Sequence, residues 1–225
     1  MKYLPGSALL LALLATGCQS DTTATKTSSA ATAAAEAPAP KSQPAILFFG
    51  DSITAGLGVE PDQAYPALIE QRVDSLHLPY TVVNAGLSGE TTAGGRSRIN
   101  WVLSRQPVSV FVLELGGNDG LRGIPLTSTR QNLQAIIDTV RQKAPQTKIV
   151  LAGMQIPPNM GPAYAADFKT LYGEIATKNK LTLIPFLLEN VGGIAKLNQR
   201  DGIHPTPAGH KLVARTVWRT LQPLL

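Results

Sequence analysis

The sequence of 225 residues contains a single cysteine, Cys18. One cysteine cannot form a disulfide within the chain or supply a cluster of zinc thiolates, so a packed core has to stabilise the fold. Runs of lysine or arginine are also absent: the 20 basic and 15 acidic residues are scattered and give a net charge of +5. This distribution indicates a mildly basic, solvated surface and argues against a nucleic-acid-binding protein.

The N-terminus lacks an apolar run long enough to span a bilayer, but it has the pattern of an export signal. Lys2 is followed by the apolar stretch LPGSALLLALLA and then by a short segment that ends at Cys18. A cysteine after small residues at this place resembles a bacterial lipobox. We therefore expect residues 1–18 to be a lipoprotein signal peptide and Cys18 to carry the lipid. Since Ala15 stands where leucine is usual, the alternative is an ordinary secretory signal cleaved near Gly17.

Residues 19–44 contain almost no large apolar side chains and consist mainly of Ala, Thr, Ser and Pro. Such a segment cannot bury enough surface to offset the cost of ordering, so we predict a disordered tether. A flexible coil of this length averages about 30 Å from end to end. Residues 45–225 have the size of one domain with its own core. We expect an exported domain that is anchored through Cys18 on the periplasmic face of the cell envelope.

Short apolar runs recur along the domain, and segments of helical period separate them. The runs that indicate buried strands are residues 45–50, 80–85, 108–115, 148–154 and 181–186. Helices are predicted at residues 64–76, 92–103, 127–143, 163–178 and 207–221. Five alternations of strand and helix predict an α/β domain, with a parallel sheet and helices on both faces.

Polar segments rich in glycine follow three of the predicted strands. These segments are GDSIT, NAGLSGETT and LGGNDGLRG, and a fourth segment, DGIHP, lies in the last long loop. Parallel strands end at one shared edge of the sheet, which is where open α/β sheets bind ligands. Ser52 lies directly after the first strand, so its position makes it a candidate nucleophile. The alternative is that Asp51 and Ser52 only cap a helical turn.

A serine nucleophile needs a base and an acid that orients the base. Asp201 and His204 offer this pair, since the carboxylate lies close enough in sequence to bond the ring nitrogen that faces away from the serine. His77 and His210 fall in predicted helices and are expected to be packing or surface residues. The Asp201 and His204 pair could instead bind a metal, but no third ligand cluster accompanies it. We therefore expect neither a metal nor a cofactor.

In their order and spacing, the four polar segments resemble the four blocks of the SGNH hydrolases, also called the GDSL lipase and esterase family. The resemblance covers nearly all of residues 45–225. It is closest to the bacterial periplasmic branch of acyl-CoA thioesterase/lysophospholipases and arylesterases, for which ELGGNDGLRG and MQIPPNMGPAY are typical. Ile53 replaces the usual leucine after GDS, an apolar exchange that should not affect the chemistry. The resemblance implies a three-layer, flavodoxin-like sandwich whose five parallel strands have the order 2-1-3-4-5.

The resemblance also implies roles for individual residues. Ser52 would be the nucleophile, His204 the general base and Asp201 its orienting partner. The oxyanion hole would combine the backbone N–H groups of Ser52 and Gly89 with the side-chain amide of Asn118. The implied reaction is the hydrolysis of carboxylic esters through an acyl-enzyme on Ser52.

The implied substrates are short to medium acyl esters or aryl esters, and also thioesters or lysophospholipids, cleaved by a monomeric domain. The segment GMQIPPNMGPAY is expected to form a wall of the acyl pocket in which Met160 or its neighbours limit acyl length; the alternative is a rigid connecting loop. Asp51 and Asp119 are expected to be structural. Three other functions stay open: a carbohydrate or cell-envelope O-deacetylase, a non-catalytic binding lipoprotein, and a lipoprotein that only tethers partners.

Overall fold

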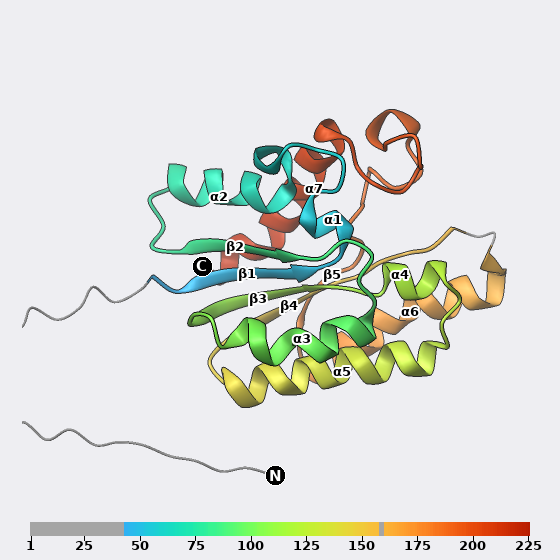
Figure 1. Cartoon of the computed structure of the whole chain (residues 1–225), viewed down its shortest axis with the longest axis horizontal. Helices are drawn as coiled ribbons and strands as arrows, with labels where there is room; N and C mark the ends of the chain where they lie inside the picture. The colour runs from blue at the N-terminus through green and yellow to red at the C-terminus, as the bar shows by residue number, and fades with distance from the viewer. Residues whose placement is uncertain (1–42, 158–159) are drawn as a thin grey trace, which may run out of the picture. The chain divides into compact units, whose positions relative to one another are not determined.

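The computed structural model describes residues 43–157 and 160–225 (Figure 1). The predicted signal peptide, and the predicted tether apart from Gln43 and Pro44, lie outside these residues. Both therefore remain predictions, as does the lipidation of Cys18. Within the described part of the chain, no helix is both long and apolar enough to cross a membrane.

The sheet has five parallel strands in the order β2-β1-β3-β4-β5, as predicted. The strands are β1 (Ala45–Gly50), β2 (Thr81–Gly86), β3 (Val108–Glu114), β4 (Lys148–Ala152) and β5 (Thr182–Ile184). All six residues of β1 are buried, as expected for an apolar strand with helices on both faces. The register pairs Gly50 with Gly86 on one side and with Glu114 on the other, so the carboxyl ends of three strands lie side by side.

Helices cover both faces of the sheet in three layers (Figure 1). On one face α2 (Tyr65–Ser75) packs against α7 (Pro207–Leu221). On the other face α5 (Leu126–Lys143) lies between α3 (Thr92–Leu103) and α6 (Pro162–Asn179) and packs against both. The bounds of these five helices agree with the sequence prediction to within one residue, because their apolar residues recur at helical spacing.

The sequence periodicity does not predict the shortest elements. The helices α1 (Ser52–Ala55) and α4 (Gly117–Leu121) directly follow the region where β1 and β3 end, and both are too short to show a helical period. The 3₁₀ helices η1 (Pro61–Gln63), η3 (Ala195–Leu197) and η4 (Gln222–Leu224) were also outside the prediction. The strand β5 ends two residues earlier than expected, because Pro185 has no N–H with which to continue the ladder.

Candidate active site

Ser52 is the first residue of α1 and directly follows the turn at the end of β1. The turn is held by Asp51, whose Oδ1 accepts the N–H of Ile53 at 3.0 Å, as the sequence predicted. A side chain cannot be accommodated at Gly50, since a Cβ there would lie 2.4 Å from Glu114 Oε2. The Gly50-Asp51-Ser52 segment therefore packs directly against Glu114, a buried acid at the end of the neighbouring strand β3.

The structure brings together the three residues that were predicted to catalyse the reaction. Ser52 Oγ lies 2.8 Å from His204 Nε2, although 152 positions separate the two residues in the chain. His204 Nδ1 lies 2.7 Å from Asp201 Oδ2. Asp201 Oδ1 also accepts the N–H groups of Ile203 and His204, both at 3.0 Å. The DGIHP segment thus fixes the carboxylate and the ring against each other.

The Asp201 carboxylate is the negative charge of this chain of hydrogen bonds. Burial alone would raise the pKa of Asp201, but the backbone N–H groups of His204 and Ile203 and the His204 ring outweigh it and lower the pKa to about 2. The side chain is 43% exposed, so water screens part of its field. At neutral pH the carboxylate is ionised and can stabilise a protonated His204.

The three predicted oxyanion donors, in Ser52, Gly89 and Asn118, line one cavity. No acceptor among the described residues bonds the backbone N–H of Ser52 or of Gly89. Gly89 has a φ of 79°, in the left-handed region that favours glycine. Asn118 Nδ2 differs, because it donates to Asp51 Oδ2 and to the carbonyl oxygen of Glu90, both at 3.1 Å. Donation from Asn118 to an oxyanion therefore requires one of these bonds to be shared.

The loop between β2 and α3 that carries Gly89 is braced by two arginines. Arg98 forms an ion pair with the buried Glu90, and its Nη2 donates to the carbonyl of Ala85 at 2.8 Å. Arg122 Nη2 donates to the carbonyl of Gly89 at 3.1 Å. Sequence reasoning missed these braces, since an arginine on a helix gives no sign of which loop it will contact.

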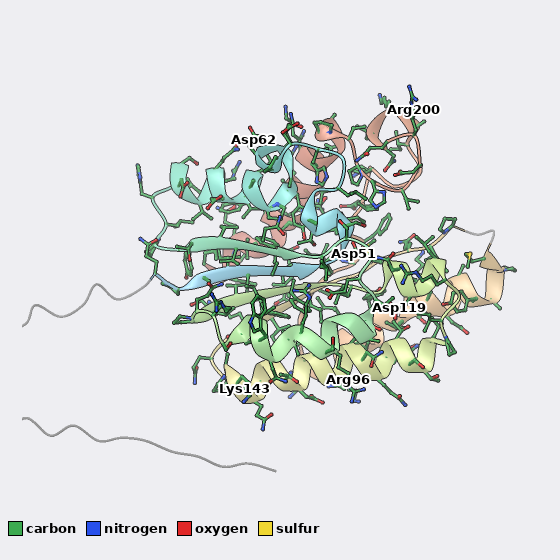
Figure 2. The ribbon with its side chains drawn as sticks, viewed as in Figure 1. Asp51, Asp62, Arg96, Asp119, Lys143 and Arg200 are labelled. Carbon is green, nitrogen blue, oxygen red and sulfur yellow. The ribbon has the colours of Figure 1, made fainter. Side chains whose placement is uncertain are left out.

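Asp119 has the structural role that was predicted for it. Its Oδ2 accepts the N–H of Thr92 at 2.8 Å, and its Oδ1 accepts the Thr92 hydroxyl. These bonds tie α4 to the start of α3. Figure 2 places Asp51 and Asp119 at the same end of the sheet, beside α1 and α4.

Glu114, the last residue of β3, is a second buried acid that the sequence reading missed. Its Oε2 accepts the N–H of Asp51 at 3.1 Å and the hydroxyl of Thr54 at 2.7 Å, while Oε1 has no partner among the described residues. Burial, followed by the nearby charge of Asp51, raises the pKa of Glu114 well above its usual range. Burial also raises the pKa of Asp51, to about 6. The raised pKa means that burial favours the protonated form of Glu114 in the folded chain.

The other two histidines lie outside this cluster. His210 is buried, and its Nδ1 accepts the N–H of Tyr65 at 3.2 Å. Burial lowers the pKa of His210 to about 4, so it is a neutral packing residue, as expected. His77 is exposed and follows the end of α2, with a φ of 51°, whereas the prediction placed it inside the helix.

A cavity of about 510 Å³ opens beside Ser52 and His204. Most side chains around it are apolar: Ile53, Leu57, Leu121, Met154, Ile156, Pro157, Phe186, Leu188 and Ile203. Residues 154–157 belong to the loop after β4, so this part of the predicted segment does form a wall. Met160 is not among the residues that line the cavity, whereas Ile156 and Pro157 of the same segment are; that this segment limits acyl length remains a prediction.

A serine hydroxyl bonded to an imidazole and a carboxylate, beside free backbone donors and an apolar cavity, is the arrangement of an acyl-transferring serine hydrolase. The chain matches the GDSL-like Lipase/Acylhydrolase family over residues 48–212 and belongs to this family. It is accordingly a carboxylic ester hydrolase, as the four sequence segments predicted.

Three relatives illustrate the similarity. Esterase TesA of Pseudomonas aeruginosa is 43% identical over 180 residues, which cover 80% of this chain and 89% of the relative. The thioesterase 1/protease 1/lysophospholipase L1 of Escherichia coli K12 is 34% identical over 180 residues, covering 80% and 84%. A crystal structure of TesA superimposes with a TM-score of 0.77 at 42% identity and covers 80% of this chain and 99% of the solved one.

Proposed function

We propose that this chain cleaves carboxylic esters through an acyl-enzyme on Ser52. The observation that carries the proposal is the continuous series of hydrogen bonds from Ser52 Oγ through the His204 ring to Asp201. His204 Nε2 takes the hydroxyl proton as Ser52 Oγ attacks the carbonyl carbon of the ester. The ionised Asp201 fixes the ring in the tautomer that leaves Nε2 free and stabilises the imidazolium that forms.

The negative oxygen that develops on the substrate is placed between the N–H groups of Ser52 and Gly89. Asn118 supplies a third donor when it shares one of the bonds it makes to Asp51 and Glu90. His204 then gives its proton to the leaving alcohol, and the acyl group stays on Ser52. A water molecule deprotonated by His204 releases the acid and restores the hydroxyl.

The cavity supports an apolar acyl or aryl group on the substrate. Its side chains are mostly apolar, which suits an acyl chain better than the hydroxyl groups of a sugar, so an ester of short to medium chain length is favoured over an acetylated carbohydrate. Thioesters and lysophospholipids are the finer candidates, because the Escherichia coli relative is a thioesterase and lysophospholipase by name. Their cleavage would need the same residues and a different leaving group.

Covalent labelling tests the proposed nucleophile. A fluorophosphonate probe, read by intact mass, should add once to the parent chain and not to Ser52→Ala. Turnover of p-nitrophenyl esters of increasing chain length should disappear with the label, and the series ranks the acyl lengths that the cavity accepts. An unlabelled parent that is folded would overturn the proposal and favour a binding module.

We also infer that the domain is exported, held at the membrane by lipid on Cys18, and monomeric. The support for anchoring is the apolar segment that ends at Cys18 and the tether composition of residues 19–44. In a bacterial host, intact mass of the parent should show an acylated Cys18, and Cys18→Ser should move to the soluble fraction. Light scattering of the unlipidated chain tests the monomeric state.

A further inference from the structure

Large apolar side chains are exposed at six positions of the described chain, and four of them lie at the end of the sheet that carries the site. Leu57, Leu87, Leu121 and Ile194 are between 38% and 53% exposed. We call these four residues the rim. Leu57 follows α1, Leu87 follows β2, Leu121 ends α4, and Ile194 precedes η3.

The other two positions lie at the opposite end of the sheet. Leu76 follows the end of α2, and Trp101 lies in the last turn of α3. These helices lead into the amino ends of β2 and β3, the end away from α1 and α4 in Figure 1. Four of the six exposed apolar side chains therefore share the end of the sheet that carries the site, whereas scattered single residues would be ordinary on any surface.

The rim is continuous with the cavity. Leu57 and Leu121 are themselves lining residues, and Gly89 and Gly193, which lie close to the other two rim residues in the chain, also line the cavity. The rim thus extends the apolar wall of the cavity to the outer surface.

Positive charge accompanies the rim. Arg122 follows Leu121 and is held by the Gly89 carbonyl, and Lys196 lies in η3, two residues after Ile194. Neither side chain belongs to any ion pair of the described residues. The exposed acid of the site, Asp201, is paired with His204. Among the described residues, the exposed acid Glu60 lies three positions after Leu57 and is likewise in no ion pair, so the support for an anionic partner is the pair of free cations at Arg122 and Lys196.

We propose that the rim, with Arg122 and Lys196, docks the mouth of the cavity onto an anionic lipid–water interface that contains the ester substrate. The proposal rests on the proposed function and specifies how its substrate is presented. Apolar side chains that lie in water when the enzyme is free are buried among lipid chains when it docks, and the two cations lie at the headgroups.

The test compares two double variants of the chain from residue 19 onward, which carries no lipid and keeps every described residue. Leu87→Ser with Ile194→Ser changes two rim residues that do not line the cavity. Leu76→Ser with Trp101→Ser makes the same kind of change at the other end of the sheet and is the matched control. Binding is measured by co-sedimentation with phosphatidylcholine vesicles that contain phosphatidylglycerol, and turnover with dissolved p-nitrophenyl butyrate.

The rim variant should need about tenfold more lipid for half-saturation of vesicle binding, because two apolar side chains no longer enter the interface. At lipid concentrations below saturation, its hydrolysis of a vesicle-embedded ester should be slower by a similar factor. Its turnover of dissolved p-nitrophenyl butyrate and all properties of the control should stay within about twofold of the parent. A parent that does not bind the vesicles, or a control that loses as much binding as the rim variant, overturns the proposal. So does a dimer that the rim variant dissociates, because the rim would then be an interface between copies.

Vesicle binding of Ser52→Ala separates this proposal from the proposed function. Docking does not need the nucleophile, so Ser52→Ala should bind as the parent does. A parent that binds vesicles but lacks esterase activity would contradict the ester chemistry and leave the docking surface supported. A parent that cleaves dissolved esters but does not bind vesicles would support the ester chemistry and contradict the docking surface.

Discussion

The side-chain amide of Asn118 donates to the carboxylate of Asp51 at 3.1 Å, and so joins α4 to the turn that presents Ser52. Asp51 Oδ1 holds the N–H of Ile53, while Oδ2 holds Asn118. One acid thereby fixes both the nucleophile turn and the proposed oxyanion donor. The distance between these two groups is set before any substrate binds, which is the preorganisation that oxyanion stabilisation requires.

Removing the Asn118 amide should slow turnover without unfolding the chain. We expect Asn118→Ala to lower kcat by about 10²–10³, the usual effect of losing one oxyanion donor, with a small change in KM. Steady-state kinetics with p-nitrophenyl butyrate and a thermal melt check both parts. Asn100→Ala, on the exposed face of α3, is the control. Full turnover in Asn118→Ala would show that the amide only braces the turn.

Asp201→Asn should leave the site in place but disturb the His204 tautomer. An amide cannot stabilise the imidazolium and offers a donor where the ring needs an acceptor, so we expect kcat to fall by about 10³–10⁴ with KM nearly unchanged. The pKa of Asp201 is about 2, so its carboxylate stays ionised down to about pH 3 and does not set the acidic limb of the parent's pH profile. Kinetics from pH 5 to 9 measure both effects, with Asp74→Asn as the control. A loss of only a few-fold in kcat would contradict the assignment of Asp201 as the residue that orients His204.

The long helices and strands and the candidate catalytic residues could be predicted from the sequence, for different physical reasons. The strand β1 and the helix α5 bury apolar residues at fixed periods, and a period can be counted in one dimension. Ser52, Asp201 and His204 could be named because few residue types perform acyl transfer and because their segments have an unusual composition.

The supporting contacts could not be predicted. The bond between Glu114 and the Asp51 N–H depends on the register of β3 against β1, and the contact of Arg98 with Ala85 depends on how α3 packs. No local pattern encodes either of them. Met160 is a similar case. The sequence predicted that its segment forms a wall of the cavity, but the path of the loop decides which residues of the segment line it.

The ion pair between Arg98 and Glu90 should matter more for stability than exposed pairs do. Glu90 is 3% exposed and Arg98 is 20% exposed, so Arg98→Ala leaves a buried carboxylate without a counterion. We expect a loss of about 3–5 kcal/mol in the free energy of unfolding. Urea denaturation at pH 7 measures it. Arg130→Ala, which breaks the exposed pair with Glu174, is the matched control and should cost about 1 kcal/mol or less. Equal losses would contradict the argument.

Glu114→Gln should change the dependence of stability on pH. Because burial raises the pKa of Glu114, the folded chain keeps a proton that the unfolded chain releases above its ordinary carboxyl pKa of 4.5. Where the folded state binds more protons than the unfolded state, stability falls as pH rises. The contribution of Glu114 to the stability of the parent should therefore fall from about pH 4 upward, and glutamine, which does not titrate, removes the pH dependence of that contribution.

The difference between Glu114→Gln and the parent should be small near pH 4 and should grow in favour of the variant toward pH 8. Glutamine keeps an oxygen for the Asp51 N–H and the Thr54 hydroxyl, so esterase activity should persist at neutral pH. Glu114→Ala removes that acceptor and should cost about 1–3 kcal/mol for each buried donor left unpaired. Denaturant unfolding at pH 4, 6 and 8 separates the two effects. If the free energy of unfolding depended on pH in the same way for the parent and for Glu114→Gln, Glu114 would be ionised in the folded chain and would place a buried negative charge beside the nucleophile.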